Sequence, residues 1–175
     1  MALPPSADGD APAGASNQER VPEILVDADA CPVKDEIYKV ARRYTVPVRL
    51  FSNSYFRIPL RDPLISLTVV SDGFDAADDA IAETAHDRAV VVTADILLAE
   101  RCIKAGASVL SPTGKPFTDA NIGTAIATRA IMADLRGGGD QLIDGRPSGP
   151  PPFSKADRSN FLQALDCAVS HLARA

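Results

Sequence analysis

The 175-residue sequence has no tryptophan, only two histidines, and three widely separated cysteines that form no Cys-x-x-Cys pair. The scarcity of cysteine excludes a disulfide framework and a zinc site built from thiolates, and we expect the cysteines to be reduced. No apolar run approaches the roughly 18–20 residues that span a bilayer, and the first residues lack the basic start and apolar stretch of a signal peptide. The sequence therefore predicts a cytoplasmic protein that does not associate with membranes.

An excess of positive charge is also missing. The chain has 18 basic and 23 acidic residues and a net charge of −5. This balance excludes a protein that holds nucleic acid by bulk positive charge, so any such binding must be local. Because 46% of the residues are hydrophobic and 23% are charged, the composition is that of a globular domain.

Two segments lack any hydrophobic pattern and are rich in Pro, Gly and Ser or Ala. Residues 1–20 are predicted to be a disordered tail, because they cannot bury enough surface to offset the entropy of ordering them. Residues 137–153 separate two helical patterns and are predicted to be a flexible loop. Residues 21–175 have the length of a single domain.

Short β-branched runs alternate with helical periodicity along this domain, which predicts an α/β fold. Strands are expected at 23–27, 46–52, 66–71, 89–93 and 107–111. Helices are expected at 32–44, 77–86 and 96–105, followed by two long amphipathic helices at 119–136 and 155–173. The pattern favours a mostly parallel sheet of about five strands in a three-layer α/β/α arrangement, which binds ligands beyond the carboxyl ends of its strands. The apolar stripe of the last helix would pack on the sheet or on a second subunit, so a homodimer stays open.

Aspartates follow the predicted strands at the places where ligands would bind. Asp27 comes directly after the apolar run Ile-Leu-Val, and Asp95 follows Val-Val-Val-Thr-Ala. If the first and fourth strands are neighbours, these two carboxylates converge within a few ångströms. Like charges ~4 Å apart repel by ~4 kcal/mol at an effective dielectric of ~20, so such a cluster takes up protons or binds a cation. Mg²⁺ or Mn²⁺ is the expected cofactor, because hard divalent ions prefer carboxylate and water oxygens.

Other aspartates near these strand ends have more than one interpretation. Asp29 can join the site or cap the helix that follows. In Phe-Asp-Ala-Ala-Asp-Asp, Asp75 can cap its helix and Asp79 can face solvent, whereas Asp78 lies toward the buried face and is our first choice. The predicted catalytic residues are Asp27, Asp29, Asp78 and Asp95, and the predicted metal ligands are Asp27, Asp78 and Asp95. A metal held in this way would activate a water and neutralise charge on phosphoryl oxygens, which suits phosphodiester hydrolysis.

Four sequence motifs resemble one known family: VDADACPVKDEIYKVA, FDAADDAIAE, VVTADILLAE and FSKADRSNFLQALD. They resemble the YaiI/YqxD group of uncharacterised bacterial proteins, which is related to the PIN and NYN nuclease-like folds, and the resemblance covers about residues 23–170. It implies a PIN-like domain whose strand-end aspartates hold magnesium or manganese for cleavage of RNA or DNA. Carried over by motif, these aspartates are Asp27 and Asp95, with Thr93 bracing the site. The middle acidic residue would be one of Asp75, Asp78 and Asp79.

RNA or another single-stranded nucleic acid is accordingly the expected partner. The segment SNSYFRIPLRDP, residues 52–63, combines Tyr55 and Phe56 with arginines, a mixture that stacks bases and holds phosphates, although an ordinary packed loop would also explain it. Lys34, one turn into the first helix, can reach a phosphate. The predicted substrate-binding residues are Lys34, Asn53, Arg57 and Thr93.

Two other functions compete with a metal-dependent nuclease. A haloacid-dehalogenase-like phosphatase also begins with Asp-x-Asp after a strand, so Asp27 would be its nucleophile and Asp29 its general acid. Cys31 stands where that family usually has Thr or Val, and we interpret it as a small packing residue beside the site. The other alternative is a nucleic-acid-binding module that keeps the fold without catalysis.

Overall fold

The computed structural model describes residues 20–29, 31–71, 73, 75–137 and 152–175. The predictions for the tail and for the loop at 137–153 fall almost entirely outside these residues. The elements along the chain are β1 (Glu23–Asp27), α1 (Lys34–Tyr44), β2 (Val48–Ser52), β3 (Ile65–Val69), α2 (Ala76–Thr84), β4 (Ala89–Val92), α3 (Ile96–Lys104), β5 (Ser108–Leu110), β6 (Pro116–Phe117), α4 (Asp119–Gly137) and α5 (Lys155–Arg174).

The strands form one sheet in the order β3-β2-β1-β4-β5-β6. All neighbours pair in parallel except β5 and β6, which are antiparallel. The predicted α/β fold with a mostly parallel sheet is therefore confirmed, including the contact between the first and fourth strands. The sequence predicted about five strands and did not predict β6. This strand has only two residues and begins with Pro116, which cannot donate to a ladder, so it carries no strand signal.

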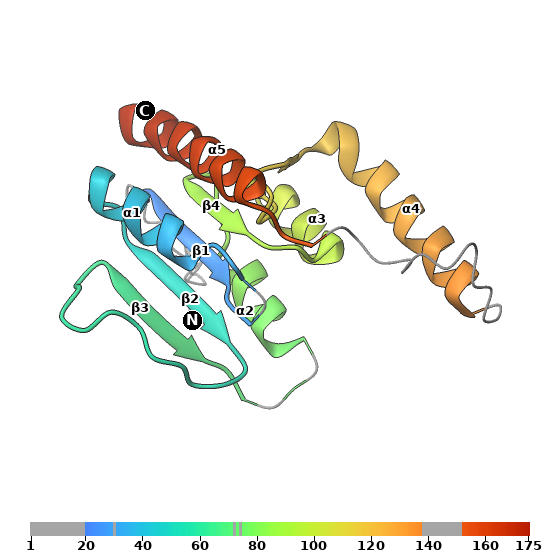
Figure 1. Cartoon of the computed structure of the whole chain (residues 1–175), viewed down its shortest axis with the longest axis horizontal. Coiled ribbons are helices and arrows are strands. Elements are labelled where there is room, and N and C mark those ends of the chain that lie inside the picture. Colours follow the sequence, from blue (N-terminus) through green and yellow to red (C-terminus); the bar gives the residue numbers. More distant parts are fainter. Residues whose placement is uncertain (1–19, 30, 72, 74, 138–151) are drawn as a thin grey trace, which may run out of the picture.

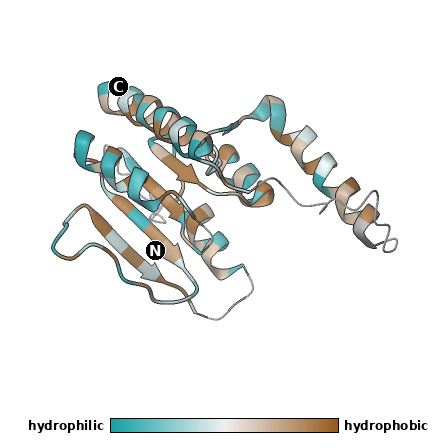
Figure 2. Ribbon diagram, in the orientation of Figure 1, coloured by the Kyte–Doolittle hydropathy of each residue, from teal (hydrophilic) through white to brown (hydrophobic). Residues whose placement is uncertain are grey.

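Helices cover both faces of the sheet, as predicted for a three-layer domain (Figure 1). On β1, Ile24 and Val26 point into a core closed by α1 and α5, whereas Leu25 points into a second core closed by α2, α3 and the start of α4. Strand side chains alternate between the two faces, and β1 and β4 are buried on both. Figure 2 shows the hydrophobic colour concentrated along these central strands.

The two long C-terminal helices differ in how they pack. The α5 helix begins with a capping box, in which Ser154 Oγ accepts from the Asp157 backbone N–H and the Asp157 carboxylate accepts from the Ser154 N–H. Phe161 and Leu165 then anchor α5 in the first core. The α4 helix extends away from the sheet (Figure 1), and its buried residue Ile122 lies in its first turn. No helix in the described part of the chain is long and apolar enough to cross a membrane.

Candidate functional site

Asp27 and Asp95 lie at the carboxyl ends of the two central strands. Asp27 is the last residue of β1, and Asp95 follows β4, which pairs directly with β1. The chain continues from β1 to β2 and β3 on one side of the sheet, whereas β4, β5 and β6 lie on the other side. The end of β1 and β4 is therefore the topological switch point, where open α/β sheets form a crevice for ligands.

Thr93 links the Asp27 carboxylate to the backbone of Asp95. Its hydroxyl donates to Asp27 Oδ2 at 3.0 Å and accepts from the Asp95 backbone N–H at 3.0 Å. The side chain of Thr93 is fully buried. These two bonds agree with the bracing role that the family resemblance implies, and substrate binding by Thr93 stays a prediction.

Asp95 also caps helix α3. Its Oδ1 atom accepts from the backbone N–H groups of Leu97 at 2.8 Å and Leu98 at 3.1 Å. This cap satisfies two of the helix donors that have no partner within α3. Asp95 Oδ2 accepts no hydrogen bond from any described residue, so this oxygen can face a ligand while Oδ1 holds the helix.

Asp78 is the member of the acidic group on α2 that interacts with these carboxylates. Burial, followed by the negative charges of Asp95, Asp27 and Asp75, raises the pKa of Asp78 from its ordinary 3.8 to about 6. Asp75 occupies the position before α2 but makes no capping hydrogen bond with its side chain. Asp79 pairs with an arginine on α3 at 2.9 Å and is largely exposed. Among the three candidates, the structure therefore brings Asp78 to the strand-end aspartates.

The pKa of Asp27 is raised as well. Burial is the largest cause, and the charges of Asp29 and Asp95 add to it, whereas the hydrogen bond from Thr93 opposes the rise. Asp27, Asp78 and Asp95 thus form a group of like charges, which we call the acidic centre. No Lys or Arg in the described part of the chain makes a salt bridge with any of the three.

The Asp29 side chain bonds to the end of β2 and does not cap α1, which was its other predicted role. Its carboxylate accepts a short hydrogen bond from Ser52 Oγ and accepts from the Asn53 backbone N–H at 3.1 and 3.3 Å. The residue before α1 is Val33, and no side chain caps that helix. Asp29 therefore anchors the start of the loop after β2. Ser52, a buried residue at the end of β2, was missed by the sequence analysis, and its place at the end of a predicted strand was the available signal.

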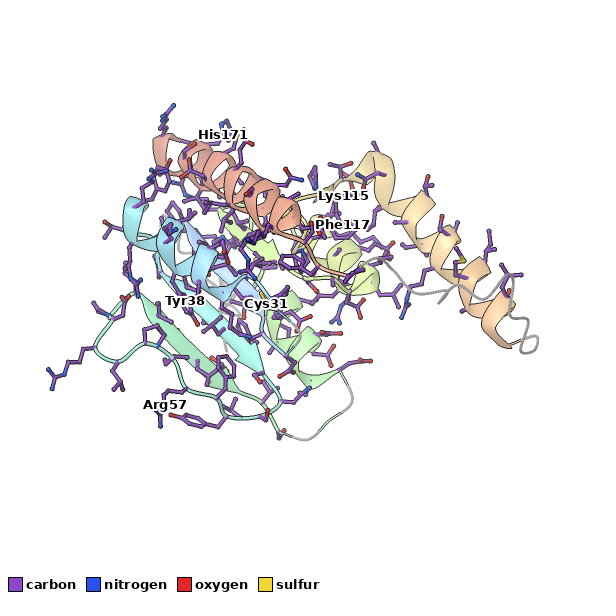
Figure 3. All side chains as sticks on the ribbon, in the orientation of Figure 1. Cys31, Tyr38, Arg57, Lys115, Phe117 and His171 are labelled. Carbon is purple, nitrogen blue, oxygen red and sulfur yellow. The ribbon has the colours of Figure 1, made fainter. Side chains whose placement is uncertain are left out.

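Lys34 and Arg57 lie in different surroundings. Lys34 Nζ donates to the Cys31 carbonyl at 3.1 Å and lies 5.0 Å from the centroid of the Phe56 ring. Arg57 is exposed on the loop beside β3, at the margin of the molecule, whereas Cys31 lies near its middle (Figure 3). Cys31 is buried, and burial raises the pKa of its thiol, which fits a packing residue.

The donor set of the acidic centre suits a hard divalent ion with several water ligands. Within the described ranges, no three His, Cys, Asp or Glu side chains are arranged so that they could hold a metal ion between them. A closed cage of three protein ligands is therefore not formed. Mg²⁺ usually keeps several waters and is bound through one or two carboxylates, so such an ion would not need a third protein ligand.

A cleft of about 340 Å³ lies at the opposite, amino-terminal edge of the sheet, among Glu23, Arg49 and His86. The Glu23 carboxylate is bonded to Arg49 at 2.8 Å and to His86 Nε2 at 2.9 Å. These groups satisfy one another, so the cleft offers neither a free carboxylate nor a free cation for catalysis.

The raised pKa of Asp78 makes stability depend on pH. The folded protein holds this proton more tightly than the unfolded chain, so the stabilisation is complete below about pH 4 and is lost as the pH rises through about 6. Asp78→Asn removes the charge. In EDTA at about pH 7.5, we expect its free energy of unfolding to exceed that of the wild type by ~1 kcal/mol, a value reduced for solvent screening. Urea unfolding near pH 7.5 and near pH 4 measures the difference, which should shrink at the lower pH.

Asp79→Asn is the matched control, because it makes the same change one residue further along α2 at an exposed ion pair. Its effect on the free energy of unfolding should be small and of opposite sign. A loss of stability in Asp78→Asn at about pH 7.5 would contradict the repulsion that we assign to the acidic centre.

The fold and the acidic centre define a doubly wound α/β domain with carboxylates at its switch point. The chain belongs to the family described as "Uncharacterized BCR, YaiI/YqxD family", whose model matches residues 25–171. A UPF0178 protein of Sphingopyxis alaskensis is 65% identical over 153 residues, which are 87% of this chain and 96% of that protein. UPF0178 proteins of Jannaschia sp. and Rhodopseudomonas palustris (strain BisB5) are 54% and 52% identical and cover 85% and 86% of this chain and 93% and 88% of their own lengths. No solved structure matches the chain. The predicted family is confirmed, and the relation to PIN domains stays a prediction.

Proposed function

We propose that the protein is a Mg²⁺- or Mn²⁺-dependent phosphodiesterase that cleaves RNA. The observation that carries the proposal is that Asp27 and Asp95 lie at the ends of the paired strands β1 and β4, that their charges act on Asp78 of α2, and that no described Lys or Arg makes a salt bridge with any of the three. Like charges held together by strand ends and a helix oppose folding unless they serve a cation or a proton. The resemblance of the Asp27 and Asp95 motifs to PIN-like nucleases supports the same chemistry.

Each residue of the acidic centre has a separate task in this proposal. Asp27 and Asp95 would hold the ion, and Thr93 keeps Asp27 in place through its hydroxyl. When bound, the ion supplies an activated water and neutralises charge on the phosphoryl oxygens. Asp78, with its pKa of about 6, can take a proton from a water beside the centre near neutral pH.

The arrangement of Asp29 supports a phosphodiesterase over a haloacid-dehalogenase-like phosphatase. That phosphatase would need Asp29 as a free general acid beside the nucleophile Asp27. Both carboxylate oxygens of Asp29 instead accept hydrogen bonds from the start of the loop after β2. A carboxylate held in this way as an acceptor is poorly placed to donate a proton to a leaving group.

A panel of substrates tests the proposal. With Mn²⁺, we expect the protein to cleave single-stranded RNA into shorter products, and we expect EDTA to abolish cleavage. Cleavage should weaken as salt rises, because phosphate contacts release counterions. Single-stranded DNA and small phosphomonoesters are incubated in parallel. Turnover of monoesters alone would favour the phosphatase, and RNA binding without turnover of any substrate would favour the non-catalytic module.

A further inference from the structure

The loop after β2 presents an aromatic and a cationic side chain on one side. In residues 55–58 the exposure alternates: Tyr55 and Arg57 are exposed, whereas Phe56 and Ile58 pack against the first core. Neighbouring side chains in extended backbone point in opposite directions, so Tyr55 and Arg57 share the outward side. The side chain of Tyr55 is 80% exposed and makes no hydrogen bond with any described residue.

Tyr55 differs from the other two tyrosines because its ring is exposed. The chain has three, of which Tyr38 is buried and Tyr44 donates its hydroxyl to Asp166 at 2.9 Å. A tyrosine ring buries a large area when it is covered, and its rigid side chain loses little entropy on binding. An exposed ring of this kind beside an arginine is the usual combination for stacking a base and holding its phosphate.

The loop is held in place at both ends and in its middle. At its start, the Asn53 N–H donates to Asp29 and the Ser54 N–H donates to Ser52 Oγ at 3.2 Å. In its middle, Phe56 packs into the core under the Lys34 ammonium group. At its far end, Asp62 pairs with an arginine of α1 at 2.8 Å. Because the loop is fixed before binding, little ordering entropy would oppose a ligand that stacks on it.

The same contacts connect the loop to the acidic centre. Asp29 holds the start of the loop, and the charge of Asp29 contributes to the raised pKa of Asp27. Arg57 nevertheless lies at the margin beside β3 (Figure 3), and β2 separates β3 from β1 in the sheet. A single phosphodiester at the centre would not reach it, so a ligand that uses both places must be a strand of several nucleotides.

We propose that residues 53–57 form a stacking platform that binds an unpaired nucleotide of the substrate strand, a few nucleotides from the bond that the acidic centre cleaves. Tyr55 stacks on the base, and Arg57 holds the neighbouring phosphate. The platform selects single strands, because bases in a duplex are already stacked on one another. This inference rests on the proposed function for the identity of the substrate.

Binding in EDTA tests the platform separately from cleavage. The probe is a fluorescein-labelled single-stranded oligouridylate of about twelve nucleotides, followed by fluorescence anisotropy. We expect Tyr55→Ala to raise the Kd by ~10-fold, since stacking contributes about 1–3 kcal/mol per base. Tyr55→Phe keeps the ring and should bind like the wild type. Arg57→Gln should weaken binding and lower the slope of log K against log salt by about one phosphate contact.

Leu60→Ala is the matched control, because Leu60 lies on the same loop and is 87% exposed but offers no ring. Leu60→Ala should leave the Kd for the oligouridylate unchanged. With an RNA duplex as the probe, Tyr55→Ala should bind as the wild type does. Failure of the wild type to bind the oligouridylate, equal binding by Tyr55→Ala, or an equal loss in Leu60→Ala would overturn the platform. Tyr55-dependent binding without metal-dependent cleavage would instead overturn the proposed function and leave the platform standing.

Discussion

Replacing Asp27 by Asn should reduce Mn²⁺-dependent RNA cleavage by at least about 100-fold, the usual cost of losing one group that stabilises charge at a reacting centre. The amide side chain of the Asp27→Asn variant keeps the shape of the carboxylate and can still accept from the Thr93 hydroxyl, so the fold should be retained. It lacks the negative charge that holds a divalent ion. Initial rates of RNA cleavage over a range of Mn²⁺ concentrations measure the loss.

The melting temperature provides a second measurement on the same variant. An ion that binds only the folded protein stabilises it by mass action, so Mn²⁺ should raise the melting temperature of the wild type and have little effect on Asp27→Asn. Asp35→Asn is the control, because Asp35 is an exposed aspartate in the first turn of α1. It should keep both cleavage and the shift. Cleavage by Asp27→Asn at the wild-type rate would remove Asp27 from the site.

The main elements of the fold could be predicted because their signals are local. The run Ile-Leu-Val of β1 and the four-residue strand β4 are buried on both faces, and a parallel strand in that position needs an uninterrupted apolar run. Asp27 and Asp95 stood out because each comes at the end of such a run. The expectation that the two carboxylates converge rested on doubly wound folds, in which the first and fourth strands are neighbours and ligands bind at the switch point.

The parts of the site that could not be predicted depend on contacts between distant segments. The bond between Asp29 and Ser52 exists only because β1 and β2 pair in one register, and this register is not visible in either segment alone. The bond between Thr93 and Asp27 is of the same kind, since it joins β1 to the residue that follows the neighbouring strand β4. The ion pair of Asp79 is of the same kind, since it depends on the position of an arginine on α3 that the sequence around Asp79 does not show.

The way in which α5 docks on the sheet also depends on a distant contact. Gly114 lies in the turn between β5 and β6 with a φ of +85°, and its N–H donates to the Ser111 carbonyl at 2.9 Å. A Cβ atom at Gly114 would lie only 2.7–2.8 Å from backbone atoms of Asn160 and Phe161 in α5. The backbone of the turn thus lies against the backbone of α5 with no room for a side chain between them, next to the fully buried ring of Phe161.

Gly114→Ala should therefore lower the free energy of unfolding by about 2–6 kcal/mol, because the strained φ and the clash with backbone each cost about 1–3 kcal/mol. Gly123→Ala makes the same chemical change inside α4, where a Cβ meets no atom within 4 Å. This variant should gain about 0.5–1 kcal/mol from the better helix propensity of alanine. Urea unfolding with a check for equal m-values compares the two variants with the wild type. Equal effects of the two substitutions would show that α5 does not pack against this turn as the structure places it.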